Sequence, residues 1–429
     1  MVTLLDLSTE LIHLIVLSLA RSIPDAKSNN DTELYRLAAT CQKLNQITKP
    51  FLYSKFIQCL PWECSQNHKF LRTILENPAL AAQVKYLALQ QTDYVYRNEY
   101  RERLPARAVI AALDNLHIVS DSRGTWVAAI KKQNEDALTA ILPLYLPNLE
   151  ELSITFAEKD EDNGYLQSAL KNAIHMKPEP ASGPFLKALR HVECDHHCYD
   201  GSFGIEDVEY FFHVPSLRTL SFSSLSVSNF SWNPALKFSN IEVLDLTSCG
   251  VDSAAWAPLL RPLQSLKKLI YSPGFSKHIE FADTAPSAIG ASLTLVKNTL
   301  ESLSLTKFCF QGISDRDFLG SLQSFPRLKE VDVHLAMLIG TKNLRRSEML
   351  WELLPSSLEE LVVMNARSGY YHKQDREDSI DQLIECISKK PTRYPLLKNL
   401  TVAHTFGSIK ALSDVCKTNS VLLVRKLVP

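Results

Sequence analysis

The stretch Cys194-Asp-His-His-Cys198 places two thiols and two imidazoles within five residues. Thiolates and imidazoles are the ligands that zinc prefers, and a cysteine next to a histidine can act as a nucleophile with its base. A zinc site needs four well-placed ligands, so His213 and Cys249 would have to complete this one from neighbouring parts of the fold. No residue that would orient a histidine base is identifiable either. We therefore expect a turn here, with no metal, no other cofactor and no enzymatic activity.

The same residues resemble the signature of the DHHC-type protein palmitoyltransferases, a family that carries it between transmembrane helices. No run of about 18 or more apolar residues follows the N-terminal segment, so the sequence predicts no membrane-spanning helix. Leu11–Ser22 has the apolar run and small residues of a secretory signal peptide, but Asp6 and Glu10 precede it where Lys or Arg would be needed. A secreted protein is thus the alternative to the location that we expect, the cytoplasm and/or the nucleus.

The composition agrees with this location and limits the class of partner. Nine cysteines, an odd number scattered from Cys41 to Cys416, suit buried thiols in a reducing compartment. A net charge of −1 without a block of Lys and Arg argues against a nucleic-acid partner. The 429 residues exceed the roughly 250–300 that one compact core holds, which predicts several domains or a repeat array.

One apolar pattern, apolar-x-x-apolar-x-apolar, recurs ten times, for example in LRTLSF from Leu217. The pattern resembles the frame of the leucine-rich repeats. This resemblance implies one short parallel strand per coil, with its apolar side chains inside a solenoid and helices on the convex side. The repeats begin at Val84, Leu149, Leu186, Leu217, Ile241, Leu266, Leu300, Leu328, Leu358 and Leu397, and their lengths after the second are an irregular 24 to 39 residues.

The repeat frame also offers a structural role for two of the cysteines. In leucine-rich repeats the residue eight positions after the first apolar one is usually Asn or Cys, which turns inward and holds the bend. Counted from Leu186 this residue is Cys194, and counted from Ile241 it is Cys249. Helices are expected between the strands, most clearly over residues 377–390, where apolar side chains have helical spacing and Asp378 is available as N-cap.

The first sixty residues do not follow the repeat frame. LLDLSTELIHLIVLSLA (residues 4–20) predicts an apolar helix with Asp6 or Ser8 as cap, and LYRLAATCQKLNQI (34–47) has helical apolar spacing that Pro50 ends. The region is therefore expected to form two or three short helices. A unit of about 50 residues buries little apolar area and usually needs a partner surface to be stable. A polar insertion, residues 21–33, separates the two segments.

These two segments resemble the F-box, the module that docks proteins on the Skp-type adaptor of cullin-type ubiquitin ligases. The first matches the family's Leu-Pro-x-Glu-Ile/Leu start with Ser8 in place of the proline, and the second matches its Leu-x-x-Val-Cys-(Lys/Arg)-x-Leu/Trp end. ITKPFLYSKF (47–56) resembles the continuation common in filamentous fungi. The implied fold class is α/β: an all-α F-box (1–56), a helical linker with the first repeat (57–145), and a leucine-rich-repeat solenoid with a C-terminal cap (146–429).

The F-box resemblance assigns adaptor docking to apolar side chains that would enter a groove of the adaptor. Some of them must instead form the F-box's own core, and the sequence does not sort the two groups. Alternatively, the two helices only cap the repeat array. The assigned residues are Leu5, Leu7, Ser8, Glu10, Leu11, Ile15, Leu37, Cys41 and Leu44.

The residues that follow the third apolar position of the repeats form a column that is expected on the concave face; hydroxyl side chains dominate its middle, and it becomes more apolar toward the C-terminal end. These residues either lie side by side as in any sheet or bind a partner that is not strongly charged. With the F-box resemblance, this pattern predicts a non-catalytic substrate-recognition subunit of a cullin-type ubiquitin ligase that holds a target protein; the alternative is a repeat scaffold without a link to ubiquitination. The candidate target-binding residues are Thr155, Ser223, Thr247, Ser272, Thr306, His334 and Met364.

Overall fold

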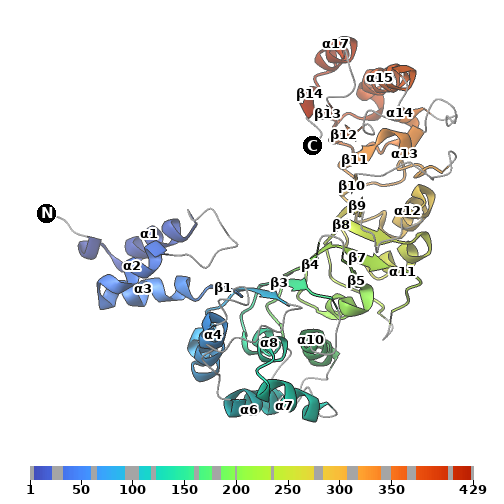
Figure 1. Cartoon of the computed structure of the whole chain (residues 1–429). Helices are drawn as coiled ribbons and strands as arrows, with labels where there is room; N and C mark the ends of the chain where they lie inside the picture. The colour runs from blue at the N-terminus through green and yellow to red at the C-terminus, as the bar shows by residue number, and fades with distance from the viewer. Residues whose placement is uncertain are drawn as a thin grey trace. The chain divides into compact units, whose positions relative to one another are not determined.

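The structure, a computed structural model, describes residues 4–21, 32–58, 65–91, 106–116, 122–158, 164–175, 185–198, 201–232, 236–274, 284–306, 317–339, 349–364, 373–403 and 409–426. The chain divides into two compact units (Figure 1). Unit 1 comprises Met1–Cys198 and His213–Leu217, and unit 2 comprises Tyr199–Phe212 and Arg218–Pro429. Residues 22–31, most of the polar insertion between the two F-box-like segments, lie outside the described residues.

Unit 1 begins with three α-helices and continues with parallel strands whose helices lie on one side of them (Figure 1). Its strands pair in the order β1-β2-β3-β4. Its elements are η1 Leu4–Asp6, α1 Thr9–Arg21, α2 Thr32–Thr40, α3 Gln42–Leu52, β1 Lys55–Ile57, α4 Ser65–Glu76, α5 Pro78–Ala81, β2 Tyr86–Gln90, α6 Ala106–Leu116, α7 Arg123–Lys131, α8 Glu135–Thr139, α9 Leu142–Tyr145, β3 Glu151–Phe156, α10 Tyr165–His175 and β4 His191–His196.

Unit 2 continues the alternation of strand and helix, with its strands paired in the order β6-β8-β9-β10-β11-β12-β13-β14 and with β5 and β7 beside β8. We call the face of each sheet that its helices do not cover the open face. The elements are β5 Phe203–Gly204, η3 Ile205–Asp207, η4 Glu209–His213, β6 Thr219–Ser223, β7 Leu225–Val227, β8 Val243–Val251, η5 Ser253–Ala255, α11 Trp256–Leu260, β9 Lys268–Pro273, α12 Pro286–Leu293, η6 Thr294–Val296, β10 Ser302–Leu305, β11 Glu330–His334, α13 Leu335–Ile339, α14 Leu350–Leu353, β12 Glu360–Met364, α15 Lys373–Ser388, α16 Lys390–Arg393, β13 Asn399–Ala403, α17 Lys410–Thr418 and β14 Leu422–Lys426.

The repeat frame read from the sequence is confirmed by both pairing and burial. In every frame except the one from Leu186, a strand begins two residues after the first apolar residue. The strands run parallel and in register, for example with Leu303 beside Val331. In unit 2 the three apolar positions of every frame are at most 1% exposed, as in Leu266, Leu269 and Tyr271. The chain therefore has the α/β fold of a leucine-rich-repeat solenoid, with stacked apolar columns inside it.

The frame from Leu186 is wrong by three residues. The strand there is β4, and the buried frame is Leu189, Val192 and Cys194, each 0% exposed. Leu186 has a φ of 56° and its carbonyl accepts a hydrogen bond from the Leu189 amide, so it belongs to a turn. Cys194 consequently pairs with Ile154 as an inward strand residue and does not hold the bend.

Cys249 does hold the bend that was expected of it. It is fully buried, and its thiol donates a 3.3 Å hydrogen bond to the carbonyl of Phe222 on the neighbouring strand. The pairing of β8 with β9 is irregular between Thr247 and Cys249, which marks the point where the chain leaves the regular ladder.

Two expected helix boundaries are also wrong. Helix α15 begins at Lys373, so Asp378 lies inside it and is not its N-cap. Of the two or three short helices predicted for the N-terminal region, the structure has three, because Cys41 is extended (φ −161°, ψ 165°) and separates α2 from α3. Pro50 lies within α3, which ends only at Leu52; a proline near a helix end removes one backbone hydrogen bond without breaking the helix.

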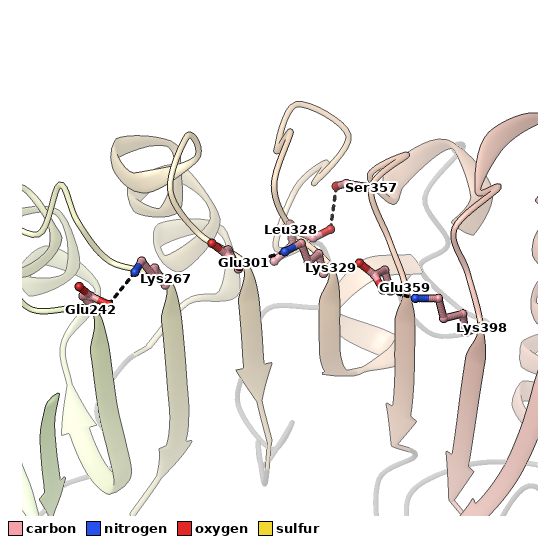
Figure 2. A network of polar contacts seen from close by, with 8 residues as sticks. All are labelled: Glu242, Lys267, Glu301, Leu328, Lys329, Ser357, Glu359 and Lys398. Carbon is pink, nitrogen blue, oxygen red and sulfur yellow. Dashed lines mark hydrogen bonds and ion pairs between the residues drawn. The ribbon is translucent and has the colours of Figure 1, made fainter. Parts of the chain in front are cut away.

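Opposite charges line the point where successive strands of unit 2 begin, at the second position of the repeat frame (Figure 2). The Lys267 ammonium lies 2.6 Å from Glu242, Lys329 lies 3.2 Å from Glu301, and Lys398 lies 2.6 Å from Glu359. We call this row the charge ladder. A hydroxyl adds a link between coils, since Ser357 donates to the carbonyl of Leu328 at 2.8 Å. The ladder was not predicted from the sequence.

A Glu301→Lys variant is expected to be less stable than Glu301→Gln, by about 1 kcal/mol at low salt, because it places a third cation between Lys267 and Lys329. The side chains are about half exposed, so salt should screen the repulsion. Urea unfolding of both variants at 20 mM and 1 M NaCl measures this difference. A difference that persists undiminished at 1 M NaCl would show that packing, and not charge, sets the stability of the ladder.

Candidate protein-docking site

The two cysteines of the Cys194–Cys198 stretch have different surroundings. Cys194 is buried on β4, whereas Cys198 is exposed. Burial raises the pKa of the Cys194 thiol well above its ordinary value, and the neighbouring carboxylates of Glu193 and Asp195 act in the same direction, so this thiol stays protonated and is a poor nucleophile. The strand extends through His196, so only His197 and Cys198 of the stretch lie beyond its end.

The groups that could have completed a metal site at this stretch have other contacts. The ring of His213 packs edge-on against His175 at 5.0 Å, and the Cys249 thiol is bonded to a backbone carbonyl. In the parts of the chain that the structure describes, no three His, Cys, Asp or Glu side chains are grouped so that they could hold a metal ion. The described chemistry-bearing residues therefore do not converge, and the candidate site lies elsewhere.

Helices α1, α2 and α3 share a small apolar core. Ile12 and Val16 on α1 pack with Leu34 on α2 and Leu44 on α3, and these four side chains are at most 5% exposed. Ile12 and Val16 are one helical turn apart, so a single face of α1 enters this core. The short helix η1 before α1 is tied to α3 by Lys43, whose ammonium donates to the Leu5 carbonyl at 3.1 Å.

A second apolar face of α1 points to solvent. Leu11, Leu14 and Ile15 are 49%, 57% and 43% exposed, and their i, i+3, i+4 spacing places them on one side of the helix, away from Ile12 and Val16. Leu5, in the short helix before α1, is also exposed. We call Leu5, Leu11, Leu14 and Ile15 the α1 stripe. A helix with apolar residues on both faces normally lies between two layers, and here one layer is solvent.

Polar residues at the start of α1 fix the first turn beneath the α1 stripe. The Ser8 hydroxyl accepts a 3.4 Å hydrogen bond from the Leu11 amide, and the Ser8 carbonyl accepts from Ile12, so Ser8 is the N-cap that the sequence predicted. The pKa of Glu10 is lowered, first by its own backbone amide and then by the Ser8 hydroxyl. Serine in place of the proline of the F-box pattern therefore leaves the helix start intact.

The structure sorts the nine residues that the F-box resemblance assigned to docking. Leu5, Ser8, Glu10, Leu11 and Ile15 are exposed and accessible to a partner. The other four pack against the core of α1–α3, so they belong to the group that was expected to form the module's own core. Of these four, Leu44 is buried, and Leu7, Leu37 and Cys41 are half-buried. Leu14, the most exposed leucine of α1, was not among the nine residues.

The candidate target-binding column on the open face is only partly accessible. Thr155 lies on β3 of unit 1, while Ser223 and Thr247 lie on β6 and β8 of unit 2 and Thr306 directly follows β10; all four are half-buried. The Thr247 hydroxyl is engaged with the Asp245 carboxylate at 2.6 Å. The side chain of Met364 lies outside the described part of the structure.

Two members of this column cannot contact a partner. Ser272 is 2% exposed, and its hydroxyl accepts a hydrogen bond from the Ser248 amide at 3.2 Å, where β8 becomes irregular. His334 is 4% exposed because α13 begins at the next residue and turns the end of β11 inward. The prediction that these two side chains bind a target is therefore wrong.

The fold assignment rests on the strands and buried columns described above and not on similarity to known proteins. No family model and no curated protein matches the chain. Among solved structures, the crystal structure of a TLR13–ssRNA13 complex is similar with a TM-score of 0.37 and 16% identity, over 83% of this chain and 48% of that one. An internalin (InlF) from Listeria monocytogenes str. 4b F2365 is similar with a TM-score of 0.33 and 13% identity, over 96% of this chain and 97% of that one. Neither likeness carries an argument about function.

Within the described residues, no helix has the length and apolar character that crossing a membrane requires.

Proposed function

We propose that this chain is the substrate-recognition subunit of a cullin-type ubiquitin ligase, in which α1 docks on a Skp-type adaptor and the repeats hold a target protein. The observation that carries the proposal is the α1 stripe, whose Leu11, Leu14 and Ile15 are exposed on a helix that already uses its other face for the module's own core. The F-box resemblance of residues 3–56 supports the identity of the partner.

The size of the exposed face supports docking in energetic terms. Completely burying one leucine side chain contributes about 1.5–3 kcal/mol, so three half-exposed side chains together offer several kcal/mol to a groove that covers them. The core of α1–α3 is small by comparison, with Ile12, Val16, Leu34 and Leu44 as its buried apolar centre. A partner on the α1 stripe would therefore stabilise the module as well as bind it.

The proposed activity requires no reaction on this chain. A receptor that holds a target near a ubiquitin-charged enzyme raises the effective concentration of the target's lysines without making or breaking a bond itself. We propose accordingly that the chain is not an enzyme and acts in the cytoplasm and/or the nucleus. The half-buried hydroxyls Ser223, Thr247 and Thr306 on the open face of unit 2 are the residues proposed to contact the target.

The test is co-expression of the full chain with a Skp-type adaptor, comparing wild type with a Leu11→Ala, Leu14→Ala double variant. If these side chains are buried anchors, truncation is expected to cost about 2 kcal/mol or more, which lowers the affinity at least 30-fold in a titration with purified adaptor. The matched control is Leu295→Ala, Leu396→Ala, which removes two exposed leucines (36% and 51%) from unit 2 and should leave the affinity within twofold.

Three outcomes separate this proposal from the scaffold reading, in which the N-terminal helices only cap the repeats. Loss of binding in the α1 variant with an unchanged far-UV spectrum supports adaptor docking. A folded wild type that does not bind the adaptor overturns the proposal and favours a repeat scaffold. Equal losses in the α1 variant and the control would mean that the binding is unspecific. Leu44→Ala, which removes a core side chain, shows what unfolding of the helices alone does to binding.

A further inference from the structure

Strand β14 has a strand neighbour on one side only. It pairs in parallel with β13, with Leu422 beside Asn399 and Lys426 beside Ala403, and it stands last in the strand order of the described residues (Figure 1). The backbone groups on its other edge thus have no described strand to pair with. An edge of this kind is a template for a further strand unless the protein blocks it.

The side chains of β14 are unusually apolar for such an edge. Leu422 is 62% and Val424 is 40% exposed, and the register places them on the open face beyond Asn399 and Thr401. In the preceding coil the corresponding residues are polar, whereas β14 offers two apolar ones with alternate spacing. A strand added at this edge could bury them with side chains of the same spacing.

The coil that ends in β14 is strongly basic. Residues 389–426 contain eight Lys and Arg but a single acidic residue, Asp414, in a chain whose net charge is −1. Several of these cations have contacts within the chain: Lys390 caps the end of α17 through the Asn419 carbonyl, and Lys398 pairs with Glu359. Arg425 and Lys426, which end β14, are exposed and also interact within the chain, Lys426 through its charge with the carboxylate of Asp332.

We propose that the edge of β14 binds an extended acidic segment of a partner protein, which adds to the sheet as a further strand. Main-chain hydrogen bonds to β14 would supply affinity, and alternate apolar side chains would cover Leu422 and Val424. The carboxylates that alternate with these apolar side chains would lie on the other face, beside Arg425, and one at the end of the added strand would lie within reach of Lys426. This surface belongs to unit 2 and is independent of the adaptor docking proposed for α1.

Charge argues for an acidic segment rather than for a second copy of this chain. Two copies joined edge to edge through β14 would bring two coils of eight cations and one anion each against one another. Like-charge juxtaposition of this kind disfavours association, whereas an acidic strand relieves it. The charged end of β14 alone could also serve to keep other strands away, but that function does not require the exposed Leu422 and Val424.

The experiment measures binding of a fluorescein-labelled seven-residue peptide that alternates glutamate and valine to the full-length chain, by fluorescence anisotropy at 100 mM NaCl. The variant Arg425→Glu, Lys426→Glu is expected to weaken binding at least tenfold. The matched control is Lys131→Glu, Lys132→Glu, which makes the same change in net charge at an exposed basic pair in unit 1 and should leave the affinity within twofold. Hydrogen exchange of the wild type should show protection of residues 422–426 on peptide binding.

Several results would overturn the proposal. One is the absence of saturable binding by the wild type; another is an equal loss in both charge variants, which would reduce the effect to net charge. Equal binding of a peptide that alternates lysine and valine would remove the chemical specificity. A concentration-dependent dimer in sedimentation velocity that Arg425→Glu, Lys426→Glu abolishes would assign the edge to a second copy instead. Exchange protection is measured on the wild type, so it tests the proposal even if a variant fails to fold.

Discussion

Gly290→Ala is expected to destabilise unit 2 by about 2 kcal/mol or more, although alanine is the better helix former. In an open helix the change would stabilise by up to about 1 kcal/mol. Gly290 lies in α12, and a Cβ at this position would overlap the carbonyl oxygen of Leu319, with the carbonyl carbon at 2.6 Å and the Cα at 3.3 Å. Because these are backbone atoms, one coil must shift against the next, and overpacking of this kind costs about 1–3 kcal/mol or more.

Gly124 in α7 is the matched control for this prediction. A Cβ there meets nothing within 4 Å, so Gly124→Ala should be neutral or slightly stabilising. Guanidinium unfolding of the two variants, with hydrogen exchange of peptides from α12 to locate the change, gives effects of opposite sign if close backbone approach is the cause. A stable Gly290→Ala variant would show that the coil of Leu319 can move away at little cost.

The core of the repeats was predictable from the sequence because its period is simple. Three apolar positions in a six-residue frame give one strand per coil, and such residues in unit 2 are almost completely buried. Strand β14 was missed because Ser420 stands where the frame needs an apolar residue, and β1 because the third apolar position is Gln58. At β4 both Leu186 and Leu189 suit the first position, and only the left-handed backbone at Leu186 decides between them.

The candidate docking site was predictable only as a group of residues. Helical periodicity shows that α1 is apolar, but it does not tell which apolar face enters the core when a helix has two. That choice depends on where α2 and α3 pack, and they cover Ile12 and Val16 while leaving Leu11 and Leu14 exposed. The open-face column failed at His334 for a related reason, since the sequence did not show that α13 begins directly after β11.

Lowering the pH from 7.5 to 5 is expected to cost unit 2 about 2 kcal/mol through His334 alone. Burial lowers the pKa of this imidazole from 6.5 to about 3. The folded state therefore keeps His334 neutral, while the unfolded chain binds a proton below about pH 6.5. The contribution of the neutral His334 side chain to the free energy of unfolding is complete above pH 6.5 and is lost as the pH falls toward 3. At pH 5, 1.5 units below 6.5, the loss at about 1.4 kcal/mol per unit is roughly 2 kcal/mol.

Two variants isolate this contribution from the other histidines of the chain. His334→Asn retains an acceptor for the Ala336 amide, which the imidazole Nδ1 accepts at 3.4 Å, and His334→Met fills the same space without one. Their stabilities at pH 7.5 should differ, because only the first keeps the hydrogen bond. Both should nevertheless lose about 2 kcal/mol less than the wild type between pH 7.5 and pH 5 in urea unfolding, because neither side chain titrates. Parallel pH curves for the wild type and both variants would mean that water reaches His334 at the end of β11, so that the folded protein accommodates the imidazolium there.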